Sequence, residues 1–234
     1  MKDKFKQIFS PIPHIDLLPP HKPACIHLKY AYKKISTHSY SCPHQYCDAF
    51  ASLIQQCLDS GFIHPSSSSF ASPSFIVPKK DPKAIPCWVC DYCQLNANTI
   101  SDNYPLPHIT EILTDCGKGK IWSTIDMTNS FFQTCIHPDN IHKMAITTPL
   151  GAYEWCVMPM GICNSPPIHQ RLCWPFSMNI LVNSAMFTWT TLLSGLKTWK
   201  NTHSMFKLFN KHYKRWAYTL TKQKPVSLIM KLPF

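Results

Sequence analysis

Acidic residues are missing from the last quarter of this 234-residue sequence. All 12 Asp and Glu lie at or before Glu154, and residues 172–234 carry 9 Lys or Arg and no carboxylate. Evolved protein surfaces normally mix both signs of charge, so this stretch is not typical of a soluble domain. Residues 1–171 are nearly balanced, with 14 Lys or Arg against 12 Asp or Glu. The formal net charge of +11 therefore reflects one segment and does not by itself indicate a nucleic-acid-binding surface.

Arginine and a secretion signal are also lacking. Only Arg171 and Arg215 accompany 21 Lys. Residues 1–6 are charged and no apolar core follows, so we expect no signal peptide and, if the chain is expressed, an intracellular location. The 12 Cys then favour free thiols over a secreted disulfide framework. The uncharged run of residues 172–196 could cross a bilayer, but Pro175 and several polar residues interrupt it, so no membrane span is expected.

Helix and strand signals alternate along the first 171 residues, which predicts the α+β class. Residues 1–43 are rich in Pro and His and are expected to be extended. Gly61 is expected to end the first helix, and Asp126 falls near the end of the third strand. The expected elements are helices over residues 50–58, 109–117 and 164–170, strands over residues 74–77, 89–92 and 120–127, and a hairpin of residues 145–157.

A series of short motifs follows in a fixed order. They are residues 14–17 (His-Ile-Asp-Leu), 61–68 (Gly-Phe-Ile-His-Pro-Ser-Ser-Ser), 71–73 (Ala-Ser-Pro), 78–81 (Pro-Lys-Lys-Asp), 91–96 (Asp-Tyr-Cys-Gln-Leu-Asn), 102–107 (Asp-Asn-Tyr-Pro-Leu-Pro), 124–133 (Thr-Ile-Asp-Met-Thr-Asn-Ser-Phe-Phe-Gln) and 153–167, which begins Tyr-Glu-Trp and contains Met-Pro-Met-Gly. Each motif alone is weak. Together, in this order and spacing, they resemble the reverse transcriptases of Gypsy-type LTR retrotransposons, and most closely the fungal branch.

The resemblance implies a right-hand polymerase with fingers and a partial palm. An extended segment of residues 1–43 would precede fingers of residues 44–105. The palm would occupy residues 106–171, and residues 172–234 would form a poorly packed tail without being a domain. The implied partners are an RNA or DNA template with its primer and a deoxynucleoside triphosphate. Oligomeric state is left open.

The resemblance also assigns roles to particular residues. Asp126 matches the first carboxylate that holds the catalytic Mg²⁺ ions, and the carbonyl of Met127 would be a backbone ligand. The positions that match nucleotide-contacting residues are Lys79, Cys87, Phe131, Met160 and Gly161. Among these, Lys79 would contact the triphosphate, and Phe131 would exclude a ribose 2′-hydroxyl.

Several departures from the family replace arginine. The family commonly has Arg at Cys87, Cys93, Cys135, Cys163 and His64, and a CGN codon becomes a Cys or His codon by deamination of its CpG dinucleotide. A thiol at position 87 cannot replace the fixed fork of donors that braces a triphosphate. Cys87, Cys90 and Cys93 also have the spacing of metal ligands, so a zinc site is an alternative interpretation.

The tail is best explained by a shifted reading frame after about Arg171. The run Phe187-Thr188-Trp189-Thr190-Thr191 is encoded TTY-ACN-TGG-ACN-ACN, and reading from the third base gives YAC, NTG, GAC and NAC. Those codons permit Tyr-x-Asp-Asp, the family's second catalytic motif. In this frame Thr190 and Thr191 occupy the positions of the two aspartates.

The sequence therefore predicts a fragment of a reverse transcriptase, an RNA-directed DNA polymerase by ancestry. Because the Tyr-x-Asp-Asp turn is lost, this chain is expected to be catalytically inactive and not to bind Mg²⁺ functionally. A non-enzymatic nucleic-acid-binding remnant is the alternative function, and a zinc-binding or membrane-associated protein is a further one.

Overall fold

A computed structural model describes most of the first 172 residues and three short segments beyond them. The described residues are 14–18, 20–31, 33, 35–36, 39–81, 84–106, 108, 110–111, 114, 121–126, 129–172, 185–187, 191–196 and 228–230, with only the backbone for 121–126 and beyond 184.

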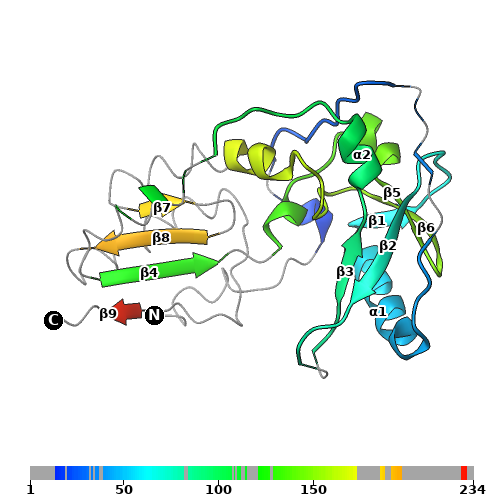
Figure 1. The fold of residues 1–234 in the computed structure, drawn as a ribbon, viewed down its shortest axis with the longest axis horizontal. Helices are drawn as coiled ribbons and strands as arrows, with labels where there is room; N and C mark the ends of the chain where they lie inside the picture. Colours follow the sequence, from blue (N-terminus) through cyan, green and yellow to red (C-terminus); the bar gives the residue numbers. More distant parts are fainter. Residues whose placement is uncertain are drawn as a thin grey trace.

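Five strands form the larger sheet, in the order β1-β6-β5-β2-β3 (Figure 1). They are β1 (Ile63–Pro65), β2 (Ser72–Val77), β3 (Cys87–Cys90), β5 (Ala145–Thr148) and β6 (Gly151–Trp155). Neighbouring strands are antiparallel except for β2 and β5, which are parallel. β5 and β6 turn through Pro149 and Leu150, with Thr148 paired to Gly151, which confirms the predicted hairpin.

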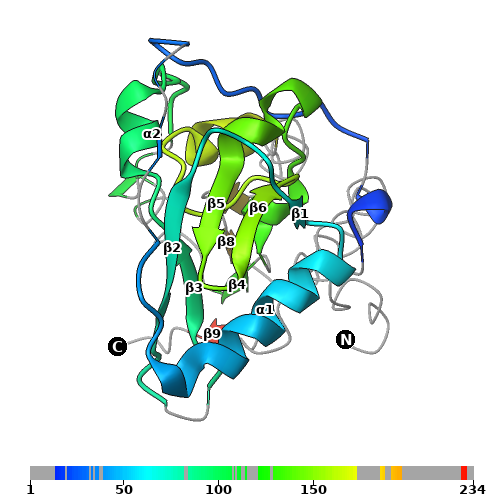
Figure 2. The ribbon, with the colours of Figure 1, turned by 90° about the vertical axis from the view of Figure 1, so that its right-hand side faces the viewer.

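Helix α1 (Cys47–Asp59) packs on this sheet (Figure 2). Its apolar residues recur every three or four positions, so one face of the helix meets the core. Phe50 and Ile54 are buried, and the ring of Phe50 meets the ring of Trp88 in β3 edge-on at 5.4 Å. Gly61 adopts φ +68 just after the helix, a conformation that glycine adopts without strain. The predicted helix and its end are confirmed.

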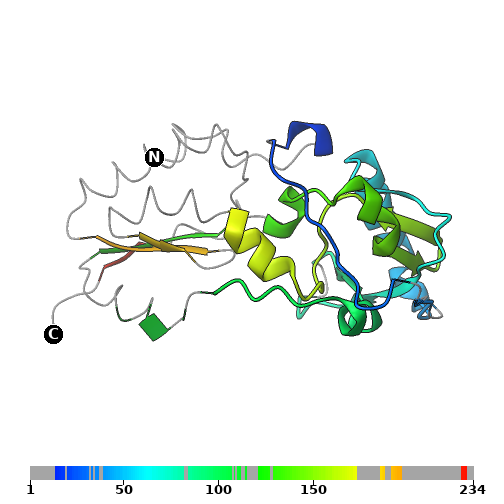
Figure 3. The ribbon, with the colours of Figure 1, turned by 90° about the horizontal axis from the view of Figure 1, so that it is seen from above.

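After the 3-10 helix Ile15–Leu17, the described N-terminal residues run along the molecule past α2 (Cys93–Asn98) and the helix of residues 165–172 (Figure 3). Residues 1–13 of the predicted extended segment lie outside the described residues. The side-chain amide of Asn98 bonds both the backbone N–H and the carbonyl of Tyr30. The backbone N–H of Ile26 donates to Asn140 Oδ1. Ala24, Ile26 and Ile35 are buried in the core, so this segment is part of the fold and not a loose arm.

A second sheet has the strand order β7-β8-β4-β9 (Figure 1). It contains β4 (Ile121–Asp126), β7 (Ala185–Phe187), β8 (Thr191–Leu196) and β9 (Leu228–Met230), all antiparallel. The sequence predicts a partial palm of residues 106–171 and a poorly packed tail of residues 172–234. The tail nevertheless supplies neighbours for the palm strand, because β8 and β9 pair with β4 on either side.

The other predicted elements can be compared in the same way. The strands of residues 74–77 and 120–127 and the helix of residues 164–170 are confirmed as β2, β4 and a helix over residues 165–172. β3 begins two residues before the predicted strand. Most of the predicted helix of residues 109–117 lies outside the described residues.

The two sheets interleave along the chain. β5 and β6 follow β4 in sequence but pair in the larger sheet with β1 and β2. The predicted boundary between fingers and palm at residue 105 therefore does not separate two sheets in space, and the segment limits remain predictions.

Candidate functional site

Asp126 is the last residue of β4 and the end of the predicted palm strand. In the ladder between β4 and β8 its Cα partner is Thr191, the first residue of β8. Antiparallel partners have Cα atoms about 4.5–5.5 Å apart, so the backbone of Thr191 lies directly beside that of Asp126. Met127 and Thr190 lie outside the described residues.

Two further candidates lie at the far end of the hairpin formed by β2 and β3. Cys87 is the first residue of β3 and pairs with Val77, the last residue of β2. Lys79 lies two residues after Val77, on the turn between the two strands. Both side chains are exposed. This hairpin therefore presents Lys79 and Cys87 to solvent.

The loop of Met160 and Gly161 is held in place by Asn96 of α2. The Asn96 amide nitrogen donates to the Gly161 carbonyl at 2.7 Å, and its oxygen accepts from the Cys163 backbone N–H at 2.9 Å. Gly161 has φ +97, and a Cβ there would lie 3.1 Å from the Cys90 carbonyl. Glycine is required by both the backbone conformation and this close approach. Met160 projects outward with 58% of its surface exposed.

A cavity of about 380 Å³ brings two of the predicted residues together. Cys87 and Met160 lie on its exposed side, and Cys90 and Trp155 lie on its buried side. Among the described residues that line the cavity there is no Asp, Glu, Lys, Arg or His. Lys79, Phe131 and Gly161 do not line it, so the structure joins only part of the predicted nucleotide-contacting set.

Phe131 lies in a short 3-10 helix, Ser130–Gln133, directly after the residues that follow β4. Its ring meets the ring of His169 edge-on at 5.4 Å, while its neighbours Asn129 and Phe132 line the cavity. His169 is fully buried, and burial lowers the pKa of its imidazole to about 4. The imidazole is therefore neutral at pH 7 and packs as part of the core.

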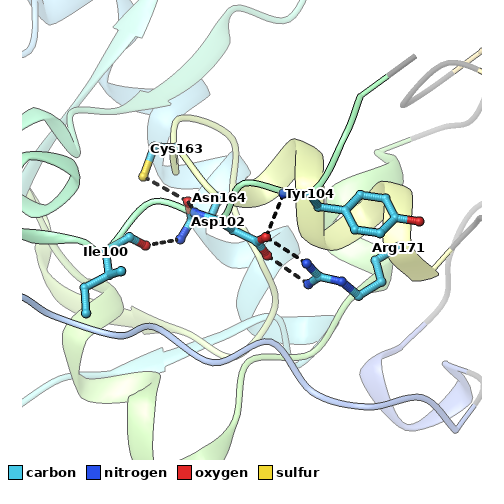
Figure 4. A network of polar contacts seen from close by, with 6 residues as sticks. All are labelled: Ile100, Asp102, Tyr104, Cys163, Asn164 and Arg171. Carbon is cyan, nitrogen blue, oxygen red and sulfur yellow. Dashed lines mark hydrogen bonds and ion pairs between the residues drawn. The ribbon is translucent and has the colours of Figure 1, made fainter.

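Arg171, in the last turn of the helix of residues 165–172, completes a network of polar contacts (Figure 4). Its guanidinium donates two hydrogen bonds to the Asp102 carboxylate, at 2.7 and 2.8 Å, and stacks 4.7 Å from the centre of the Tyr104 ring. Asn164 accepts from the Asp102 backbone N–H and donates to the Ile100 carbonyl. The hydrogen bond from Arg171 is the main reason that the pKa of Asp102 is lowered.

The proposed zinc ligands do not converge in the described part of the chain, where no group of three His, Cys, Asp or Glu side chains could hold a metal. Cys87 and Cys93 are exposed, whereas Cys90 is buried. Among the described residues, no helix combines the length and the apolar character that a membrane span needs.

Comparison with known proteins agrees with this geometry. The chain is 40% identical over 121 residues to the retrovirus-related Pol polyprotein from transposon 297 of Drosophila melanogaster, a match that covers 50% of this chain and 11% of that polyprotein. It is 35% identical over 122 residues to the Pol polyprotein from the Drosophila transposon gypsy, covering 50% of this chain and 12% of that polyprotein. Viral polyproteins are also similar, such as polyprotein P3 of Commelina yellow mottle virus, which is 35% identical over 133 residues, covering 53% of this chain and 7% of that polyprotein.

Solved structures identify the fold. The foamy viral protease–reverse transcriptase in complex with double-stranded DNA has a TM-score of 0.85 at 21% identity, covering 100% of this chain and 40% of that one. The same protein with an RNA/DNA hybrid gives 0.81 at 20% identity, covering 95% and 30%. The α+β fold is that of a reverse transcriptase polymerase domain. No protein-family model matches the chain.

The chain spans only about a tenth of the length of the curated relatives described above.

The sequence prediction overlooked the residues that support the candidate site. Asn96, Asn98 and Asn164 each bridge segments far apart in sequence. Asn96 and Asn164 lie within the motifs, but nothing local indicates that an amide will bond a backbone more than 60 residues away.

Proposed function

We propose that this chain is a reverse transcriptase fragment that no longer polymerises DNA, derived from a Gypsy-type element of the fungal branch. Its ancestral reaction is the template-directed addition of deoxynucleotides to a primer. The observation that carries the proposal is the pairing of Asp126 with Thr191 at the C-terminal end of β4, where the family has its carboxylates.

The residues at this end of β4 do not fit a pair of Mg²⁺ ions. Magnesium prefers carboxylate oxygens, and two-metal catalysis needs several carboxylates converging on both ions. Asp126 supplies one carboxylate, and its ladder partner Thr191 supplies at most a neutral hydroxyl. We therefore assign no metal-dependent step to this chain.

Primer extension tests the proposal directly. We expect the purified chain to extend a DNA primer on an RNA template, with Mg²⁺ and all four deoxynucleotides, no more than its Asp126→Ala variant does. Extension by the wild-type chain above that control would contradict the proposal.

A frame-repaired chain gives the matching positive control. Inserting one base near codon 171 should restore the Tyr-x-Asp-Asp turn and produce measurable extension. We expect Cys87→Arg to raise that activity further, because a guanidinium fork can brace a triphosphate and a thiol cannot. If the repaired chain were inactive even with Cys87→Arg, the loss of the turn would not explain the inactivity.

A second candidate function is non-enzymatic binding of nucleic acid. It is favoured by the charge of residues 172–234, which carry 9 Lys or Arg and no acid, and by the double-stranded DNA and RNA/DNA hybrid held by the structurally similar foamy viral protein. Binding to an RNA/DNA hybrid should then weaken steeply with salt and fall when the chain is truncated after Arg171.

A further inference from the structure

The cavity beside Cys87 and Met160 differs from a phosphate site in its chemistry. A triphosphate needs cationic side chains or a cradle of backbone N–H groups. The side chains that line this cavity, all from described residues, include no Lys, Arg or His. Cys87 is exposed at its rim, at the position where the resemblance implies an arginine.

Two thiols in the cavity, those of Cys57 and Cys90, also carry no charge near neutral pH. Burial raises the pKa of Cys57 to about 12 and that of Cys90 to about 12. Both therefore remain neutral thiols, which behave as small apolar groups. The polar side chains along the wall are amides and hydroxyls, such as Gln56, Ser60 and Asn129, and these are neutral too.

Four aromatic rings form much of the remaining wall, together with Leu53, Pro159 and Met160. Trp155 lies 5.2 Å from Trp88 and 5.0 Å from Phe132, measured between ring centres, and Phe132 lies 5.8 Å from Phe62. All four rings line the cavity. Apolar and aromatic walls with a few neutral polar groups are typical of sites for small organic ligands, and the volume falls within the usual range of about 300–1,000 Å³.

We propose that this cavity binds a small, uncharged aromatic molecule and excludes the triphosphate that the resemblance would place beside it. Stacking on the indole and phenyl faces supplies the contact, and Gln56 and Asn129 at the exposed side offer hydrogen bonds to a neutral polar substituent. This inference goes beyond the proposed function, because binding in the cavity does not depend on whether the chain polymerises DNA.

Three probes that share a ring system and differ in charge test the proposal. They are 2-naphthalenemethanol, which is neutral, 2-naphthoate, an anion, and 2-naphthylmethylamine, a cation at pH 7. We expect ligand-observed saturation-transfer NMR with the full chain to give the strongest binding for the alcohol. The chain's net charge of +11 favours the anion at any nonspecific surface site. Equal or stronger binding of 2-naphthoate would therefore overturn the proposal.

Variants at exposed cysteines locate the site. Cys87→Trp should fill the open side and weaken binding of the alcohol about tenfold, because burial of the probe's rings is its main source of affinity. Cys163→Trp makes the same change at an exposed cysteine that does not line the cavity and should leave binding unchanged. Equal effects of the two substitutions, or no effect of Cys87→Trp, would place the probe elsewhere and overturn the assignment.

A charge-introducing variant tests the reason for the selectivity. Cys87→Arg should weaken the preference for the alcohol and increase binding of 2-naphthoate. Mg²⁺ with dTTP should fail to displace the alcohol from the wild-type chain. Displacement by dTTP, or an unchanged ranking of the probes in Cys87→Arg, would contradict a site whose neutral lining decides its ligand. Primer extension reports on the proposed function separately, so the two ideas can fail independently.

Discussion

We expect residues 14–171 and residues 172–234 to differ in how far side-chain packing holds them in the fold. In the first region, particular side chains fit particular places, such as Asn96 on the Gly161 loop and Arg171 on Asp102. Beyond residue 184 only the backbone is described, and there β8 and β9 join β4 through hydrogen-bonded ladders. Every residue except proline offers the same backbone donor and acceptor, so strand pairing survives a change of sequence that side-chain packing does not.

Such a difference would reconcile the proposed frame shift with the pairing of β8 and β9 with β4. Apolar residues often persist in a shifted frame, because codons rich in T remain so after the shift. Under the proposed frame shift, a strand such as β8 can therefore form beside β4 without its residues having been selected to fit the palm. We predict that side-chain substitutions will be costly in the first region and cheap in the second.

The largest expected contrast is between two apolar truncations. Phe50→Ala removes a ring with 1% exposure that packs on Trp88, and it should lower the free energy of unfolding by about 3–5 kcal/mol. Leu193→Ala in β8 should cost less than about 1 kcal/mol. Urea unfolding followed by circular dichroism gives both values. Similar costs for the two substitutions would remove the distinction between the regions.

The next effect concerns pH and His169. The pKa of His169 is about 4 in the folded state, below its ordinary value of 6.5. The neutral, buried imidazole therefore contributes fully to the stability of the fold above about pH 6.5, and this contribution is lost as the pH falls toward 4. The free energy of unfolding should decrease by about 3 kcal/mol over that range. His169→Phe should flatten this dependence, as measured by urea midpoints at several pH values. An equally steep dependence in His169→Phe would assign the effect to other groups.

A smaller difference in stability is expected between substitutions of Arg171 and Arg215, the two arginines of the chain. Arg171→Ala breaks the bidentate pair with Asp102, but Arg171 is half exposed, so the cost should be about 1 kcal/mol or less. The pKa of Asp102 is lowered in the folded state, so this contribution is present above the ordinary pKa of the carboxyl and disappears as the pH falls through the lowered value. Arg171→Lys should recover only part of it, because lysine lacks the fork.

Arg215→Ala is the matched control for Arg171→Ala. Under the proposed frame shift it should leave the urea midpoint unchanged at every pH, because a side chain encoded out of frame would not have been selected for a partner. A loss equal to that of Arg171→Ala would show that the tail has specific side-chain contacts.

The sequence predicted α1, β4 and the hairpin of β5 and β6 because local patterns specify them: helical spacing in residues 50–58, and strand signals around Asp126 and Pro149. It did not predict α2, which has only six residues, or the cavity beside Cys87. Those features depend on contacts between distant segments, such as Asn96 with Gly161, which local spacing does not encode. The sequence did not predict the pairing of β8 with β4, because backbone hydrogen bonds can join two strands whose side chains give no sign of packing together.

The central claim is that residues 172–234 are encoded out of frame, and the nucleotide sequence of the locus tests it most directly. The account predicts that codons 187–191, read from the third base, give Tyr-x-Asp-Asp, and that this frame continues from that of residues 14–171 after one inserted base near codon 171. A locus in which that shifted frame is closed by stop codons or does not encode Asp-Asp would contradict the account.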